Sequence, residues 1–330
     1  MENITRVAKV APGREQTYFW ASDHSVLFLR NVQGQPYYAA ALLDIHTQTE
    51  QPLNALNAIL GESMSAIPMH VHYVDETGKQ TEPMQVVYPP PPCNLSPDGQ
   101  WLLWQRRSWR SSTWVAFALD SARQIEWPKQ NQVACGDGEP FWMQDNRQWV
   151  ELIQRYDRNE WRFIQAIIHS LDAPTTSQSI RLTGTAGGLA LGVTHENRLL
   201  IADYVNDPIR EARCFLMELH PQVAVTTEYT ISLPVGPTHI NQIVLSPQGD
   251  RLAWVLGSVL DRENIGFWVS DLKGAQMHQI GSVPVLETRR GPRQEKTGLD
   301  WPQELCWRPD GKQLSFLYDG ALWTVPSAGL

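Results

Sequence analysis

The sequence predicts an all-β protein: a β-propeller of six four-stranded antiparallel blades, closed into a ring by an N-terminal strand. A short motif recurs along the chain, each copy reads as two strands joined by a tight turn, and most copies are spaced by about one blade. Radial repetition of such units lets a chain of 330 residues build one continuous core with only short sheet edges.

The clearest copies of the motif occupy residues 93–104, 243–254 and 305–316. Each contains proline followed by Asp or Gln and then glycine. Proline presets φ to about −65° at the second turn position, and glycine accepts the left-handed conformation that such a turn needs. We therefore expect a positive φ at Gly99, Gly249 and Gly311.

Weaker copies at 19–29, 141–151 and 192–201 bring the number of predicted blades to six. The last copy is followed by only one further strand, at 321–325, so its blade lacks a fourth. Residues 4–10 are a spare candidate strand, and we expect them to complete this blade and close the ring.

An insertion at 53–92 separates the first two copies. We expect it to lie within a single propeller domain covering residues 1–330. Leu53, Leu56, Ile59 and Leu60 share one helical face. Residues 69–74 and 84–88 alternate around Gly78 as a hairpin would, and four prolines at 89–92 favour an extended return to the ring. The insertion is either a binding element or a cap on the edge of a blade.

Composition limits the possible functions. The net charge of −8 argues against binding nucleic acid or anionic lipid through overall charge. The four cysteines form no C-x-x-C pair, so we expect reduced thiols and no zinc ribbon. The first residues do not read as a signal peptide and no apolar run approaches membrane-spanning length, which predicts a cytoplasmic protein without a membrane span.

The Ser-Pro-Asp-Gly strand pairs resemble the repeats of the TolB-like, WD-related six-bladed propellers. The resemblance covers nearly the whole chain and implies the fold, not an activity. The export signal and the extra domain of periplasmic TolB proteins have no counterpart in the sequence. The propellers of the prolyl oligopeptidase family have similar repeats, but the G-x-S-x-G motif of a hydrolase domain is missing here.

Loops that join second to third strands share one face of a propeller with the blade-to-blade connections; we call it the top face. These loops are rich in arginine and aromatic residues, with Trp301 just beyond the last of them. Such a composition is typical of protein interfaces. We predict a protein partner with an acidic surface. The predicted contact residues are Arg106, Arg107, Trp109, Arg110, Arg155, Arg158, Trp161, Arg162, Arg289, Arg290 and Arg293.

A second hypothesis places chemistry at the mouth of the central channel. Glu139, His239 and Glu304 fall just before or within predicted inner strands, where they could hold a cation or move protons, as in some propeller lactonases. Structural polarity is the alternative, because propeller channels normally contain polar side chains and water. His70 and His72 could share a strand face, but no third ligand accompanies them, so no metal or cofactor is predicted.

The function predicted from the sequence is therefore a non-catalytic protein-binding scaffold or assembly factor. It would use the top-face loops and the 53–88 insertion. The alternative is a propeller hydrolase or lactonase with a cation or acid–base site in the channel mouth. Binding of nucleic acid is disfavoured because carboxylates are interspersed among the arginines.

Overall fold

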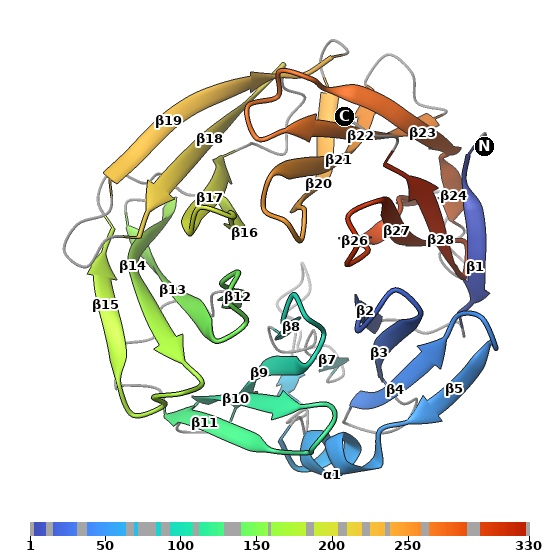
Figure 1. Ribbon diagram of the computed structural model, residues 1–330. Coiled ribbons are helices and arrows are strands. Elements are labelled where there is room, and N and C mark those ends of the chain that lie inside the picture. Colours follow the sequence, from blue (N-terminus) through green and yellow to red (C-terminus); the bar gives the residue numbers. More distant parts are fainter. Residues whose placement is uncertain are drawn as a thin grey trace, which may run out of the picture.

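The structure is a computed structural model in which six four-stranded sheets form a ring around a central opening (Figure 1). It describes residues 3–10, 16–31, 38–63, 69–71, 84–86, 93–107, 112–128, 140–157, 160–182, 188–203, 210–219, 225–234, 238–258, 264–288 and 298–327, and the structural statements below concern these. The first strand of each repeat lies nearest the centre. The predicted propeller of six antiparallel four-stranded blades is confirmed.

The strands follow the chain order within each blade, from the centre to the rim. Blade 1 contains β2 (Gln16–Trp20), β3 (Ser25–Asn31), β4 (Tyr38–Asp44) and β5 (Thr49–Pro52). Blade 2 contains β8 (Cys93–Leu95), β9 (Trp101–Arg107), β10 (Ser112–Ala118) and β11 (Gln124–Pro128). Blade 3 contains β12 (Pro140–Trp142), β13 (Gln148–Asp157), β14 (Glu160–Ser170) and β15 (Ser177–Arg181).

The remaining blades repeat this arrangement. Blade 4 contains β16 (Leu189–Val193), β17 (Arg198–Asp203), β18 (Glu211–Glu218) and β19 (Val225–Ser232). Blade 5 contains β20 (Thr238–Leu245), β21 (Arg251–Ser258), β22 (Asn264–Asp271) and β23 (His278–Pro284). Blade 6 contains β26 (Gln303–Trp307), β27 (Gln313–Tyr318), β28 (Ala321–Pro326) and, at its rim, β1 (Thr5–Lys9).

Blade 6 joins the two ends of the described chain. β1 pairs antiparallel with β28, with Thr5 opposite Thr324 and Lys9 opposite Ala321. The backbone N–H of Val10 then donates to the carbonyl of Gly320 at 3.0 Å. Val10 is buried in the apolar cluster shared by blades 6 and 1. The predicted closure of the ring by the N-terminal strand is confirmed.

The turns between first and second strands lie at the end of the channel opposite the top face; we call this end the turn face. Gly99, Gly249 and Gly311 have φ values of +71°, +69° and +65°, as predicted. The hydroxyl oxygen of Ser96 accepts a hydrogen bond from the backbone N–H of Trp101 at 2.9 Å, which closes the turn from within. The motif is therefore a hydrogen-bonded unit that the local sequence specifies.

The turn glycines also allow neighbouring blades to meet. A Cβ atom on Gly99 would overlap the backbone carbonyl of Ala21 in blade 1, and one on Gly249 would overlap the backbone N of His195 in blade 4. The sequence predicts only the left-handed φ, whereas the structure adds this backbone-to-backbone packing as a second reason for glycine.

The insertion contains the predicted helix, α1 (Asn54–Ser63). Leu56 and Leu60 are fully buried in the apolar cluster between blades 1 and 2. Asn57 accepts a hydrogen bond from the backbone N of Ala40 at 2.5 Å and donates to its carbonyl at 3.1 Å. The helix therefore caps the edge of blade 1. For this part of the insertion, the structure agrees with the second of the two expected roles, a cap on a blade edge.

Two small hairpins lie outside the blades. β6 (Met69–Val71) pairs antiparallel with β7 (Met84–Val86), as expected for the insertion; the turn and the four prolines lie outside the described residues. β24 (Leu286–Thr288) pairs with β25 (Gly298–Asp300), where the sequence analysis expected a loop. Each of these strands has only three residues, too few to show a period of two.

The core lies between the blades. Phe267 of blade 5 stacks on Phe316 of blade 6, with ring centroids 4.3 Å apart. Trp127 of blade 2 meets Trp149 of blade 3 edge to face at 5.4 Å. No helix in the described part of the chain is long and apolar enough to cross a membrane.

Candidate functional site

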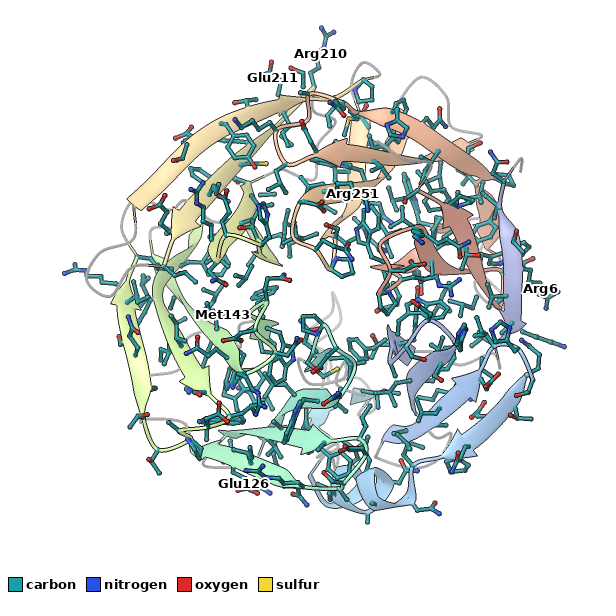
Figure 2. The ribbon with its side chains drawn as sticks, viewed as in Figure 1. Arg6, Glu126, Met143, Arg210, Glu211 and Arg251 are labelled. Atoms are coloured by element: carbon teal, nitrogen blue, oxygen red, sulfur yellow. The ribbon has the colours of Figure 1, made fainter. Side chains whose placement is uncertain are left out.

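Arg106 is the one predicted contact residue whose side chain the structure describes. It lies near the end of β9, and its Nη2 atom pairs with Oε2 of Glu126 at 2.8 Å. Glu126 points outward at the rim of blade 2, as does Arg6 on β1 at the rim of blade 6 (Figure 2). More than a third of each side chain in the Arg106–Glu126 pair is exposed, so the pair contributes little to stability.

The long hairpin of β13 and β14 brings two predicted residues together. Its strands have ten and eleven residues, and their register places Arg155 directly opposite Arg162. The next pair toward the top face is Tyr156 opposite Trp161. Residues directly opposite in an antiparallel pair have Cβ atoms about 5 Å apart on one face, and like charges there are destabilising. The register therefore places the two arginine positions on one face of the hairpin and the two aromatic positions on the other.

The remaining predicted contact residues belong to the other top-face loops and to this hairpin. Trp109, Arg110, Arg158, Arg289, Arg290 and Arg293 lie outside the described residues, as do the side chains of Arg107, Arg155, Trp161 and Arg162. The β24–β25 hairpin brackets the segment that carries Arg289, Arg290 and Arg293. Trp301, just after β25, lies against Gly257, where any Cβ atom would overlap its ring. Trp301 is therefore a packing residue at the base of this hairpin.

Glu304 is the best-defined of the three candidate channel residues. It lies in β26, has a left-handed φ of +53°, and falls within an irregularity of the pairing between β26 and β27. Its Oε2 atom accepts a hydrogen bond from the Thr17 hydroxyl of blade 1 at 2.8 Å. A left-handed φ is costly for a residue with a long side chain, so the surrounding structure must hold it in place.

The environment of Glu304 shifts several pKa values. The residue keeps exposed surface, but protein atoms crowd its carboxyl group, and this desolvation raises its pKa above the usual range. Burial and the Glu304 carboxylate together raise the pKa of the Cys306 thiol to about 12. Burial is also the main reason why the pKa of Tyr18 is raised well above its ordinary value. Glu304, Cys306 and Tyr18 therefore belong to the contact between blade 6 and blade 1, where burial keeps a group uncharged or a hydrogen bond satisfies it.

The structure describes two of the three residues of the predicted channel site. His239 is half-buried in β20 and Glu304 lies in the neighbouring inner strand β26, without a recorded contact between them; Glu139 lies outside the described residues. His70 faces Gln85 across the β6–β7 pair, and His72 lies outside the described part. Within the described ranges, no three His, Cys, Asp or Glu residues are grouped closely enough to hold a metal ion.

Polar side chains in the inner strands and just beyond them bond across blade boundaries. Asn94 donates to the carbonyl of Pro140 at 3.0 Å, and Gln144 donates to that of Val193 at 3.2 Å. Gln242 accepts from the backbone N–H of Leu305 at 2.6 Å and donates to the carbonyl of Pro302 at 3.1 Å. These amides hold neighbouring inner strands together.

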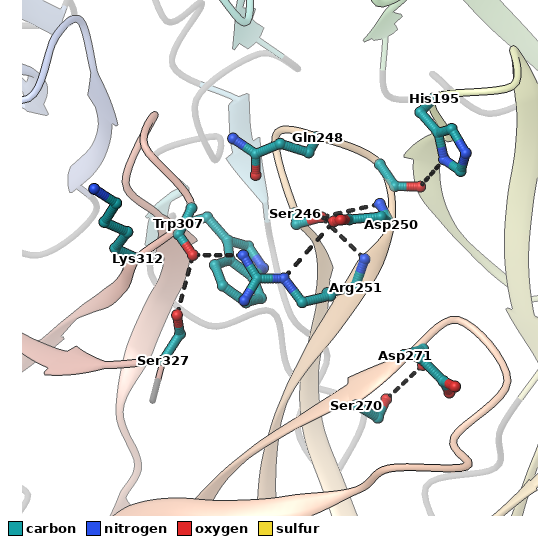
Figure 3. A network of polar contacts seen from close by, with 12 residues as sticks. His195, Ser246, Gln248, Asp250, Arg251, Ser270, Asp271, Trp307, Lys312 and Ser327 are labelled. Atoms are coloured by element: carbon teal, nitrogen blue, oxygen red, sulfur yellow. Dashed lines mark hydrogen bonds and ion pairs between the residues drawn. The ribbon is translucent and has the colours of Figure 1, made fainter. Parts of the chain in front are cut away.

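Two arginines at the turn face join neighbouring blades. Arg251 of blade 5 lies over the ring of Trp307, 4.9 Å from its centroid, and donates to the carbonyl of Gly311 at 2.6 Å (Figure 3). Arg308 of blade 6 lies over Trp20 of blade 1 at 4.8 Å. Cation–π contacts of this kind, once shielded from water, are favourable by about 1–2 kcal/mol. Both arginines therefore help to hold neighbouring blades of the propeller together.

The channel itself contains a cavity of about 390 Å³. Its lining includes one apolar residue from the inner strand of each blade: Phe19, Leu95, Phe141, Leu189, Ile243 and Trp307. Pro97, Pro247 and Pro309 line it at the turn face. This lining could not be predicted from the sequence, because alternation along a single inner strand does not tell which side chains meet around a central axis.

Comparison with known proteins supports the fold alone. No protein-family model matches the sequence, and no curated protein matches it. TolB from Acinetobacter baumannii has a similar structure, with a TM-score of 0.51 and 10% identity over 92% of this chain. This chain spans 64% of the length of that TolB chain.

Two further solved structures are similar. An oligogalacturonate lyase in complex with manganese has a TM-score of 0.50 at 12% identity, over 98% of this chain and 90% of the lyase. A chain of the mitotic checkpoint complex has a TM-score of 0.50 at 10% identity, over 99% and 95% of the two chains. The resemblance to TolB-like, WD-related propellers is confirmed at the level of the fold.

Proposed function

We propose that this chain is a non-catalytic scaffold or assembly factor that binds a protein with an acidic surface on its top face. The arginine- and aromatic-rich loops and the 53–88 insertion make the contact. In this proposal residues 1–330 act as one cytoplasmic domain that includes the insertion at 53–92, and no cofactor takes part.

The observation that carries the proposal is the register of β13 and β14. It sets Arg155 opposite Arg162, and Tyr156 opposite Trp161 at the next pair of positions. Like charges in directly opposite positions reduce stability, and a binding role would explain why two arginines occupy such positions despite that cost. An acidic partner removes that cost on binding, because guanidinium groups pair with carboxylates in a bidentate manner.

The amide side chains that join neighbouring blades provide a second, independent support. Asn94, Gln144 and Gln242 use their polar groups to join blades. Side chains committed in this way make the inner strands rigid, which suits a platform that presents its loops to a partner.

The experiment that tests the proposal is a single charge reversal, Arg155→Glu. Opposite Arg162, the new carboxylate forms a cross-strand ion pair, so stability stays equal or rises by a few tenths of a kcal/mol. Capture of the partner from native extract, at an ionic strength of about 0.15 M, should fall at least tenfold. The two measurements are a melting curve and the amount of co-purified protein.

The matched control is Arg6→Glu, an equal change of charge at the rim of blade 6 (Figure 2). It should leave capture unchanged. The top-face proposal is refuted if Arg155→Glu retains the same co-purified proteins as the parent chain, or if the control loses them to the same extent.

A second candidate function rests on Glu304. Its left-handed backbone, raised pKa and place in an inner strand are features often found at catalytic sites. The similarity in fold to an oligogalacturonate lyase in complex with manganese suggests an assay. The chain would be incubated with oligogalacturonate and Mn²⁺, and the ultraviolet absorbance of the unsaturated product of elimination would be followed. Turnover that Glu304→Gln abolishes would favour the enzyme over the scaffold.

A further inference from the structure

We infer that the central channel is a binding site for an uncharged, largely apolar small molecule. The inference concerns the channel cavity, not the top-face loops, and does not depend on the proposed scaffold function. It rests on the volume of the cavity, the chemistry of its wall and one exposed leucine.

The volume is that of a small-molecule site. Sites for small ligands measure roughly 300–1,000 Å³ and are lined mostly by apolar side chains with a few polar groups. The channel cavity of about 390 Å³ falls within this range. Its polar lining side chains are Asn94, Ser96 and Cys306. The inner strands of all six blades surround it, so a ligand enters along the axis of the ring.

The wall selects against charge. Among the lining residues that the structure describes, none is Asp, Glu, Lys, Arg or His. A charged ligand would therefore leave water without gaining a counter-ion, which costs several kcal/mol. An uncharged ligand avoids this penalty and covers the apolar side chains, at about 25 cal/mol for each Å² removed from water.

Leu189 provides an exposed apolar surface in the wall that a ligand would cover. It is the first residue of β16, lines the cavity and is 37% exposed. It is the only large apolar side chain that is exposed among the described residues. The apolar residues that pack between the blades are buried. Leu189 differs from them because its side chain stays exposed at the channel wall.

The test uses two dyes that share one ring system. N-phenyl-1-naphthylamine is neutral, and 1-anilinonaphthalene-8-sulfonate carries a negative charge. The neutral dye should bind the native chain with one saturable site and at least tenfold more tightly than the sulfonate. Leu189→Arg places a cation in the wall, so it should weaken the neutral dye at least fivefold and strengthen the sulfonate.

Leu272→Arg is the matched control, because Leu272 is a half-buried leucine outside the cavity lining. It should change neither titration. Leu189→Gln, with melting curves for every variant, separates lost binding from lost folding: it should weaken the neutral dye without helping the sulfonate. Equal affinity of the native chain for both dyes, or an unchanged neutral-dye titration in a folded Leu189 variant, overturns the inference.

Discussion

At the scale of single residues, glycine at the blade turns serves two separate needs. Gly99 has a left-handed φ and also lies against the backbone of Ala21 in the preceding blade. Gly320, in the β27–β28 turn, has a similar φ of +65° but has no atom within 4 Å of the position a Cβ would take. Substitutions at these two glycines therefore separate the free-energy cost of a left-handed backbone from the cost of crowding.

We predict that Gly320→Ala costs about 1–2 kcal/mol, which is the penalty of a left-handed φ for an L-residue. Gly99→Ala should cost about 2–5 kcal/mol, because overpacking adds to that penalty. Urea unfolding of both variants measures the difference. Equal free energies of unfolding would show that the blades do not rely on this close approach.

Glu304 provides a second prediction for a single residue. Desolvation raises the pKa of its carboxyl group above 4.5. At pH values above this raised pKa the group is charged in the folded state, and the buried charge lowers the free energy of unfolding. Glu304→Gln should therefore raise the melting temperature at pH 8. As the pH falls through the raised pKa toward 4.5, the parent chain takes up its proton and the difference should disappear.

The control for this prediction has the opposite sign. The pKa of Glu228 is lowered by its hydrogen bond from Arg213, so its charged form favours the folded state above the ordinary pKa. Glu228→Gln should lower the melting temperature slightly at pH 8 and have no effect at low pH. A Glu304→Gln variant that is less stable than the parent at pH 8 would contradict the desolvation account.

At the scale of elements, β1 carries more of the fold than its five residues suggest. It covers the rim edge of β28 and leads into Val10, which is buried between blades 6 and 1. Without it, the edge of blade 6 would expose unpaired backbone groups.

Deleting residues 1–10 should lower the free energy of unfolding by at least about 3 kcal/mol, since one buried valine and several ladder hydrogen bonds are lost. The measurement is chemical unfolding of the truncated and full chains. Lys9→Ala, an exposed position on the same strand, should be nearly neutral, whereas Val10→Ala should reproduce part of the loss. A truncated chain as stable as the parent would show that blade 6 does not need its fourth strand.

Local elements are the part of the fold that the sequence could predict. The Ser96-to-Gly99 turn and its copies specify their own geometry, and the leucine face of α1 follows a helical period. The β24–β25 hairpin was missed because three paired residues carry no period. Trp301 was grouped with interface aromatics, but its contact with Gly257 joins residues from different strands that no local pattern connects.

At the scale of the whole molecule, the candidate sites depend on contacts around the ring. Thr17 and Glu304 are 287 residues apart, and their hydrogen bond exists only because blade 6 meets blade 1. Arg251 and Arg308 stack on tryptophans of the next blade, contacts that no local sequence pattern indicates. The apolar channel wall likewise arises from six strands that are distant in sequence. Sequence reasoning identified the residue types, and the circular order of the blades decided their roles.

The pairing of Thr5 with Thr324 has a consequence for how the chain is made. During synthesis β1 leaves the ribosome long before its partner β28 is translated. Bringing the two together costs about 5 kcal/mol in loop entropy if the intervening chain is still unfolded, and far less once five blades have already formed. Until then β1 and the edge of β28 are both free to pair elsewhere. At high concentration, β1 of one newly made chain can therefore complete the last blade of another, and the two rings become an exchanged dimer.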